Sequence, residues 1–252
     1  MAIRNVNHVV SIMDIDLFQW WREVSTGFAV VANESSLQRQ IERFARRLGF
    51  EHYSLGARGM VTLHDTARIL STYPAPLLDR YRQAGYLAID PTVRIGARSR
   101  DVVVWSDTLF AKTPRFWDEA RDFGLRAGLA QSTWGRGGLF TLLSLARERP
   151  AVTMAEAAEL RPYLLMLAEC ASAKLQQLID MEGARRYAQR LSPREIEVLK
   201  WSALGKTAFE ASEQLGVTSA TVQFHLQNAK RKLGVTTKIQ ATDHARRLGL
   251  ID

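Results

Sequence analysis

The chain has very little cysteine and no long apolar run. Cys170 is its one cysteine among 252 residues, which excludes an intramolecular disulfide and a zinc site built on several thiols. Because Cys170 lies in an apolar stretch, we expect a buried, unreactive thiol. Glu169 and Lys174 interrupt that stretch, so no membrane span is predicted. Residues 1–14 lack a signal-peptide pattern, and we expect a cytoplasmic protein with no membrane partner.

Signatures of catalysis are missing as well. Ser144 can be drawn as a hydrolytic nucleophile with His64 and Asp90, but no GxSxG turn surrounds this serine. The five histidines are scattered along the chain and form no metal-ligand cluster. We therefore predict a protein that is not an enzyme and that needs no metal or organic cofactor.

Positive charge is present in excess and is unevenly distributed. The chain holds 34 Lys and Arg against 26 Asp and Glu, a net charge of +8. Residues 185–252 hold 12 of these basic residues and only 6 acidic ones, so most of the excess lies in the last quarter. A small basic region joined to a nearly neutral one is typical of a module that binds a polyanion, although a solvated basic face has the same charge.

A polar segment, DMEGARRYAQR at residues 180–190, divides the chain. Before it, residues 153–178 show a helical pattern that opens with a capping box of Thr153 and Glu156. Apolar residues recur there at helical spacing, namely Leu160, Leu164, Leu167, Ala171, Leu175 and Leu178. Such a stripe packs in a core or in a dimer seam, and the pattern favours neither. We predict a first domain over 1–179, a linker over 180–190 and a second domain over 191–252.

The first domain mixes helical and strand patterns. Helices are predicted over 17–48 and 117–126 in addition to the long one. Strands are predicted over 52–56, 60–63, 67–71, 101–105, 130–134 and 139–145. Helices before, between and after strands predict an α+β fold, in which an antiparallel sheet lies between two helical layers as an α-β-α sandwich. A small all-α domain follows it.

The second domain contains three short helices with clear boundaries. The expected N-caps are Ser192, Thr207 and Thr218, and Gly205 and Gly216 end the first two helices. Two short helices around a glycine-containing turn, the second basic at its far end, predict a helix-turn-helix.

This segment resembles a known family. Residues 192–235, SPREIEVLKWSALGKTAFEASEQLGVTSATVQFHLQNAKRKLGV, are similar to the helix-turn-helix of LuxR-type regulators. The matching positions are Glu195, Leu199, Gly205, Lys206, Glu210, Thr221, Val222, His225, Asn228, Lys232 and Leu233. The resemblance implies that double-stranded DNA is a partner and that the third helix lies in the major groove.

The chemistry of several side chains of this motif suggests their roles. Gln223, Phe224 and Gln227 lie opposite the apolar face of the third helix; glutamine pairs with adenine and phenylalanine packs on a thymine methyl group. Phosphate contacts are expected from Lys206, Thr221, Lys230 and Arg231. For Glu195 an ion pair or cap within the domain is expected, with contact to RNA polymerase as the alternative.

The first domain resembles the autoinducer-binding domain of quorum-sensing LuxR proteins. The resemblance is carried by Tyr73, Tyr81, Asp90-Pro91, the WSD of 105–107, Trp117, the DFGLRAG of 122–128 and the LLSLAR of 142–147. It implies a pocket, between the sheet and a helical layer, that holds a small-molecule signal, an N-acyl-homoserine lactone.

The resemblance also implies roles for single residues. Asp90 would accept the amide N–H of the lactone, Tyr73 would donate to the amide carbonyl, and Ser144 would contact the acyl end. The cavity lining is expected to comprise Leu77, Tyr81, Trp105, Phe116, Trp117 and Leu125. Simpler alternatives remain open, because an aspartate before a proline also caps turns and aromatic residues also fill cores.

One position departs from the family. Four residues before Tyr81 the family has a tryptophan, whose indole N–H donates to the lactone ring carbonyl, and this chain has Leu77. A buried carbonyl without a donor costs about 1–3 kcal/mol, or roughly one to two decades of affinity. Either another group or a water supplies the donor, or the signal is not an ordinary acyl-homoserine lactone, or no ligand is needed.

The combined pattern predicts a homodimeric transcription factor that binds a palindromic DNA site under the control of a small acylated signal. A LuxR-type regulator that works without a lactone, or on another signal, remains the alternative because of Leu77. A phosphorylated response regulator shares the DNA-binding motif, but the first domain lacks the parallel βαβ pattern and acidic cluster of a receiver.

Overall fold

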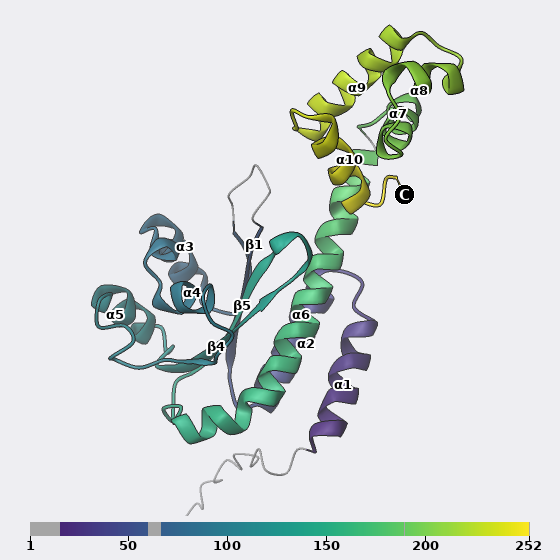
Figure 1. Cartoon of the computed structure of the whole chain (residues 1–252). Coiled ribbons are helices and arrows are strands. Elements are labelled where there is room, and N and C mark those ends of the chain that lie inside the picture. The colour runs from purple at the N-terminus through teal and green to yellow at the C-terminus, as the bar shows by residue number, and fades with distance from the viewer. Residues whose placement is uncertain (1–15, 60–66, 189, 252) are drawn as a thin grey trace, which may run out of the picture. The chain divides into compact units, whose positions relative to one another are not determined.

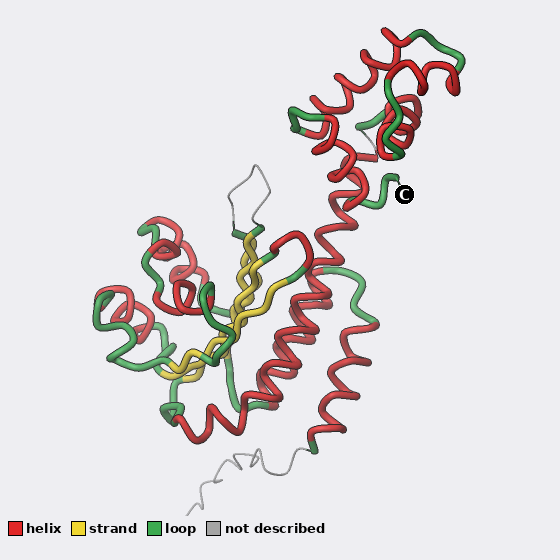
Figure 2. Tube along the Cα trace, in the orientation of Figure 1, coloured by secondary structure: helices red, strands yellow, loops and turns green. Residues whose placement is uncertain are grey.

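The computed structural model describes residues 16–59, 67–188 and 190–251 (Figure 1). The chain divides into two compact units, Met1–Gln176 and Gln177–Asp252. In the described residues the strands belong to the first unit, and the second unit is helical (Figure 2). The strand predicted over 60–63 lies outside the described residues.

A five-stranded antiparallel sheet forms the centre of the first unit. Its order is β2-β1-β5-β4-β3, with β1 at His52–Arg58, β2 at Arg68–Ser71, β3 at Val103–Val104, β4 at Ala127–Trp134 and β5 at Phe140–Arg147. The other five predicted strands are confirmed, with shifted ends. β4 begins three residues before the predicted start because Ala127 already pairs with Arg147 of β5.

Helices cover both faces of this sheet (Figure 1). One face carries α1 (Leu17–Ala29), α2 (Glu34–Arg47) and α6 (Met154–Ala188). The other carries α3 (Ala75–Gln83), the 3₁₀ turn η2 (Tyr86–Ala88), α4 (Pro91–Gly96) and α5 (Pro114–Asp122). The predicted α-β-α sandwich is therefore confirmed. The short helices α3 and α4 were not predicted, because six to nine residues show too little periodicity.

Two helix predictions need correction. The single helix expected over 17–48 is two helices, because Asn33 starts a second one: its side chain accepts from Ser36 N at 2.9 Å, and Ser36 Oγ accepts from Asn33 N at 3.1 Å. The helix expected over 117–126 begins earlier, since Pro114 occupies its first turn. It ends before Gly124, whose φ of +84° is left-handed.

The long helix α6 packs its apolar stripe into the core of the first unit. Five members of the predicted stripe are fully buried and are therefore core: Leu160, Leu164, Leu167, Ala171 and Leu175. The sixth, Leu178, is only partly buried. Thr153 Oγ1 accepts from Glu156 N at 3.1 Å as expected for a cap. Cys170 is half-buried and not fully buried as predicted. The helix continues to Ala188, so most of the segment predicted as a linker is helical.

The second unit contains α7 (Pro193–Ala203), α8 (Ala208–Leu215), α9 (Ser219–Leu233) and α10 (Lys238–Arg247). The predicted caps are present: Ser192, Thr207 and Thr218 each accept a hydrogen bond from the backbone N–H three residues later. The predicted helix-turn-helix is α8 and α9. None of the helices in the described part of the chain has the length and apolar character that crossing a bilayer demands.

Candidate ligand cavity and nucleic-acid interface

The first unit contains a partly open cavity of about 120 Å³. Its walls come from β1, β2 and β5 on one side and from α3, α4 and α5 on the other. All nine residues expected to contact a ligand line it, namely Tyr73, Leu77, Tyr81, Asp90, Trp105, Phe116, Trp117, Leu125 and Ser144. Residues up to 71 positions apart in the sequence thus share one cavity, and their roles in binding stay predictions.

Aromatic rings form the apolar wall of the cavity. Phe110 and Trp117 stack with ring centroids 4.5 Å apart and planes 9° apart. Tyr81 meets Phe116 edge to face at 5.5 Å, and Trp105 meets Trp117 in the same way at 6.1 Å. Flat apolar surfaces of this kind suit an acyl chain or a small ring, because they bury apolar area without polar groups that need partners.

Asp90 provides the acidic group of the cavity. It is only 7% exposed and caps α4, with Oδ1 accepting from Thr92 N at 2.8 Å and from Thr92 Oγ1 at 2.6 Å. Oδ2 accepts from the Tyr81 hydroxyl at 3.0 Å. Burial raises the pKa of Asp90, although the hydrogen bonds from Thr92 and Tyr81 oppose this shift. Asp90 thus caps α4 and also lines the cavity, so a capping role and a ligand-binding role for this residue do not exclude each other.

Two hydrogen-bond donors in the wall are buried without a partner in the described residues. They are the Tyr73 hydroxyl and the Trp105 indole Nε1. Burial raises the pKa of Tyr73 far above its usual value, so the phenol stays protonated and able to donate. The cavity thus offers one carboxylate acceptor and two unpaired donors, a set that fits a ligand with an N–H and two acceptor oxygens.

Several cavity residues had no sequence signal strong enough to be predicted. Phe110 lies in an irregular segment, and Leu142 lies on β5 in a run of buried residues. Ser54 and Gly56 also line the cavity, at alternate positions of β1. The period of two along β1 could have identified that pair once the position of the cavity was known.

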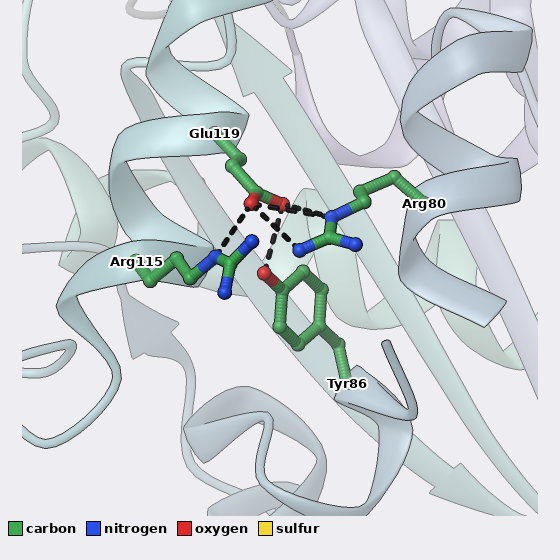
Figure 3. Close-up of polar contacts among 4 residues, drawn as sticks. All are labelled: Arg80, Tyr86, Arg115 and Glu119. Carbon is green, nitrogen blue, oxygen red and sulfur yellow. Dashed lines mark hydrogen bonds and ion pairs between the residues drawn. The ribbon is translucent and has the colours of Figure 1, made fainter. Parts of the chain in front are cut away.

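An ion-pair cluster joins the helices that cover the cavity (Figure 3). Glu119 of α5 accepts from Arg80 Nε of α3 at 3.0 Å, from the Tyr86 hydroxyl of η2 at 2.8 Å and from Arg115 Nε at 3.1 Å. The hydrogen bonds from Arg80 and the other donors lower the pKa of Glu119 to about 2. The cluster ties α3 and η2 to α5, so it holds together the elements that carry Leu77, Tyr81 and Phe116.

Replacing Glu119 by Gln should lower the stability of the first unit by about 1 kcal/mol, given the partial exposure of the cluster. The Glu119 pKa is depressed in the folded state, so its contribution is full above the unfolded value near 4.5 and is lost as pH falls toward 2. Thermal unfolding should show a midpoint about 2–4 °C lower at neutral pH and no difference from wild type at about pH 2. Glu159→Gln, an exposed change on α6, is the control, and equal midpoints at neutral pH would contradict the role of the cluster.

The outward face of α9 carries the residues expected to contact bases. Gln223, Phe224 and Gln227 are exposed, with Phe224 at 62%, whereas Val222 and Ala229 are buried against the rest of the unit. This arrangement matches the expected orientation of a recognition helix. Its contacts with bases remain a prediction.

The residues expected to contact phosphates have partners within the chain. Lys206 Nζ lies 3.1 Å from Glu210 Oε1 on the half-exposed start of α8. Lys230 Nζ donates to Thr236 O at 3.2 Å, Arg231 to Asn228 Oδ1 at 3.3 Å, and Thr221 Oγ1 lies 2.9 Å from Thr218 Oγ1. Such exposed contacts are weak, so they leave the cations able to exchange partners for phosphate.

Glu195 has the intradomain role. It is 3% exposed, and its Oε2 accepts from Ser192 N and from Lys232 Nζ, each at 2.7 Å. Burial raises the pKa of this carboxyl, but the hydrogen bonds from Lys232 and Ser192 outweigh burial and the net pKa is lowered. The cap and the ion pair are both present, and they leave this buried side chain little surface for a polymerase.

A mostly apolar cavity with a few polar groups, carried on one chain with a helix-turn-helix, is typical of a ligand-responsive DNA-binding protein. The family described as "Autoinducer binding domain" matches residues 33–175, and the one described as "Bacterial regulatory proteins, luxR family" matches residues 189–245. The chain belongs to the LuxR family of quorum-sensing transcriptional regulators.

Relatives match over nearly their whole length. The transcriptional activator protein SolR of Ralstonia nicotianae is 39% identical over 225 residues, which cover 89% of this chain and 95% of SolR. The quorum-sensing regulator RhlR of Pseudomonas aeruginosa is 33% identical over 235 residues, covering 92% and 96%. The crystal structure of Escherichia coli SdiA superposes with a TM-score of 0.68 at 28% identity, covering 93% of this chain and 99% of SdiA. SdiA in complex with octanoyl-rac-glycerol also gives a TM-score of 0.68 at 28% identity, covering 94% and 97%.

Proposed function

We propose that the first domain binds an N-acyl-homoserine lactone and that the chain, as a homodimer, binds a palindromic DNA site through α9. The observation that carries this proposal is the cavity, which gathers an acceptor carboxylate, two unpaired donors and an aromatic wall. An acylated lactone has the complementary set, namely one amide N–H, two carbonyl oxygens and an apolar tail.

The contacts follow from the chemistry of each group. Asp90 accepts the amide N–H through Oδ2, which receives only the Tyr81 hydroxyl from the described residues. Tyr73 donates to the amide carbonyl, which gives its buried hydroxyl the partner it lacks. The rings of Trp105, Phe116 and Trp117 pack against the ligand, and Ser144 meets the acyl end.

Binding would act on transcription through the dimer. A ligand that fills the cavity stabilises the helical cover formed by α3, α4 and α5, and thereby favours the dimer arrangement that spaces two copies of α9 for two half-sites. In this proposal the regulator works in the cytoplasm, with no metal or organic cofactor and no membrane partner, and RNA polymerase is a partner through a surface other than Glu195.

A second candidate is a LuxR-type regulator of a different signal. Leu77 is 3% exposed in the cavity and brings no donor to it. SdiA has been solved with octanoyl-rac-glycerol, an acyl ester without an amide. If this chain takes such an ester, Asp90 accepts a glycerol hydroxyl in place of the amide N–H. A regulator that needs no ligand is the third possibility.

The thermal midpoint of the purified full chain separates these candidates. A ligand that binds only the folded state stabilises it by about 2.7 kcal/mol at a hundred times its Kd, which corresponds to a rise of roughly 5–10 °C in the first domain. We expect this rise with one acyl-chain length from a panel of N-acyl-homoserine lactones.

Octanoylglycerol is added to the panel of compounds, and every compound is tested on both the wild type and the Leu77→Trp variant. A rise with octanoylglycerol alone would favour the second candidate. A stable wild type whose midpoint does not move with any compound, beside a Leu77→Trp variant that responds to a lactone, would favour the ligand-independent regulator.

A further inference from the structure

Two donors in the cavity wall call for a partner. The Tyr73 hydroxyl and the Trp105 Nε1 are both sealed from solvent and unpaired in the described residues. An unsatisfied buried donor is destabilising, and native structures keep few of them. With the amide carbonyl assigned to Tyr73, the Trp105 N–H remains for a second acceptor on the ligand.

Three other donors of the wall are already engaged. The Tyr81 hydroxyl donates to Asp90 at 3.0 Å, and the Thr92 hydroxyl donates to the same carboxylate at 2.6 Å. Trp117 Nε1 donates to Asp107 Oδ1 at 2.6 Å. Of the two indoles that line the cavity, Trp105 is therefore the one whose N–H has no partner in the described residues.

Packing fixes the direction of the Trp105 indole. A Cβ on Gly128 would lie 2.8 Å from its Cδ2 and Cε3 atoms, so the indole packs directly on the bare backbone of β4. The rings of Phe110 and Trp117 pack against this indole edge to face, with interplanar angles of 89° and 87°. Nε1 is not among the three atoms nearest to that Cβ, so the tight contact with Gly128 involves the other side of the indole. The N–H is thus held in place before a ligand arrives.

We propose that Trp105 Nε1–H is the second donor to the head group and hydrogen-bonds the ring carbonyl oxygen of an N-acyl lactone. Tyr73 and Asp90 hold the amide in the same complex. This assignment rests on the proposed function and deepens it, because it makes Trp105 a specificity-determining residue. Leu77 supports it: a leucine at 3% exposure supplies no donor, which leaves this role open to another group of the wall.

A double comparison of protein and ligand tests the assignment. The two ligands are the N-acyl-homoserine lactone that shifts the wild-type midpoint most and the N-cyclopentyl amide of the same acid, which keeps the ring size and lacks the ring carbonyl. The two proteins are the wild-type full chain and Trp105→Phe, with dissociation constants measured by calorimetry. We expect the wild type to prefer the lactone about tenfold, the value of one neutral hydrogen bond. Trp105→Phe should abolish this preference because it removes the donor, whereas any loss of packing weakens both ligands by the same factor.

Loss of packing is distinguished from loss of the hydrogen bond by the same data. If Trp105→Phe weakens both ligands equally, the indole acts only by packing, and the assignment is overturned. If the wild type binds the lactone but the variant keeps the tenfold preference, the assignment also fails while the proposed function stands. A wild type that binds neither compound overturns both.

A measurement on the wild type covers the case in which the variant does not fold. The indole N–H signals of the six tryptophans are recorded by ¹⁵N-correlated NMR. A buried, slowly exchanging indole proton should move downfield with the lactone and stay in place with the cyclopentyl amide. No ligand-specific movement of any indole proton would overturn the assignment.

Discussion

Replacing Asp90 by Asn should weaken the binding of an N-acyl-homoserine lactone about 10–100-fold. A hydrogen bond to a charged acceptor contributes about 1.5–3 kcal/mol, and asparagine carries an NH2 donor at the Oδ2 position, which cannot accept the amide N–H. The side-chain oxygen of Asn can still cap α4 through Thr92 N, so the unliganded protein should fold. Calorimetric titration of both proteins measures the difference.

Asp79→Asn is the matched control for Asp90→Asn. Asp79 is an exposed carboxylate of α3 that pairs with Arg82 at 2.9 Å, outside the cavity. We expect this variant to bind like the wild type. Equal affinities of wild type and Asp90→Asn, with unfolding midpoints showing both folded, would contradict the role of Asp90 as the amide acceptor.

The pH dependence of binding follows from the same carboxylate. Burial raises the pKa of Asp90 in the unliganded cavity, so its protonated form becomes populated at a higher pH than for an exposed aspartate. An amide N–H prefers the ionised form, so wild-type affinity should fall as pH is lowered through the raised pKa. Asp90→Asn should lack this dependence.

Affinity for DNA should fall about 10³-fold between roughly 50 and 200 mM salt if the dimer makes six cationic phosphate contacts. These contacts are Lys206, Lys230 and Arg231 from each protomer. Because each neutralised phosphate releases counterions, a plot of log affinity against log salt should have a slope of about −5. Fluorescence anisotropy with a labelled duplex that holds the target site measures this slope.

Single substitutions should change the slope in proportion to the phosphate contacts removed. Lys230→Ala or Arg231→Ala removes two contacts per dimer and should reduce the slope by about 2. Lys112→Ala removes one positive charge from an exposed position of the first unit and serves as the control. If Lys112→Ala and Lys230→Ala reduce the slope equally, net charge and not local contact governs binding.

The second domain was largely predictable from the sequence because its signals are local. Ser192, Thr207 and Thr218 each cap a helix through a contact three residues away, and Gly216 ends α8 in a left-handed conformation with φ of +63°. Such signals act within one turn and do not depend on the rest of the fold. The helix α10 was not predicted, although Thr237 caps it, because it lies beyond the helix-turn-helix motif of residues 192–235.

For the first domain, the sequence determined the fold class, most of the strands and, through family resemblance, the nine cavity residues. Tertiary structure alone decided how those residues are arranged around one cavity. The apolar spacing of Leu160 and Leu164 did not show which surface covers them, and only the packed structure places them in a core. Likewise, only the packed structure shows that the Tyr73 hydroxyl and the Trp105 indole N–H are buried without a partner in the described residues. The Arg80–Glu119 contact joins residues 39 positions apart. Pairing over such distances depends on how helices pack, and no local pattern in the sequence encodes it.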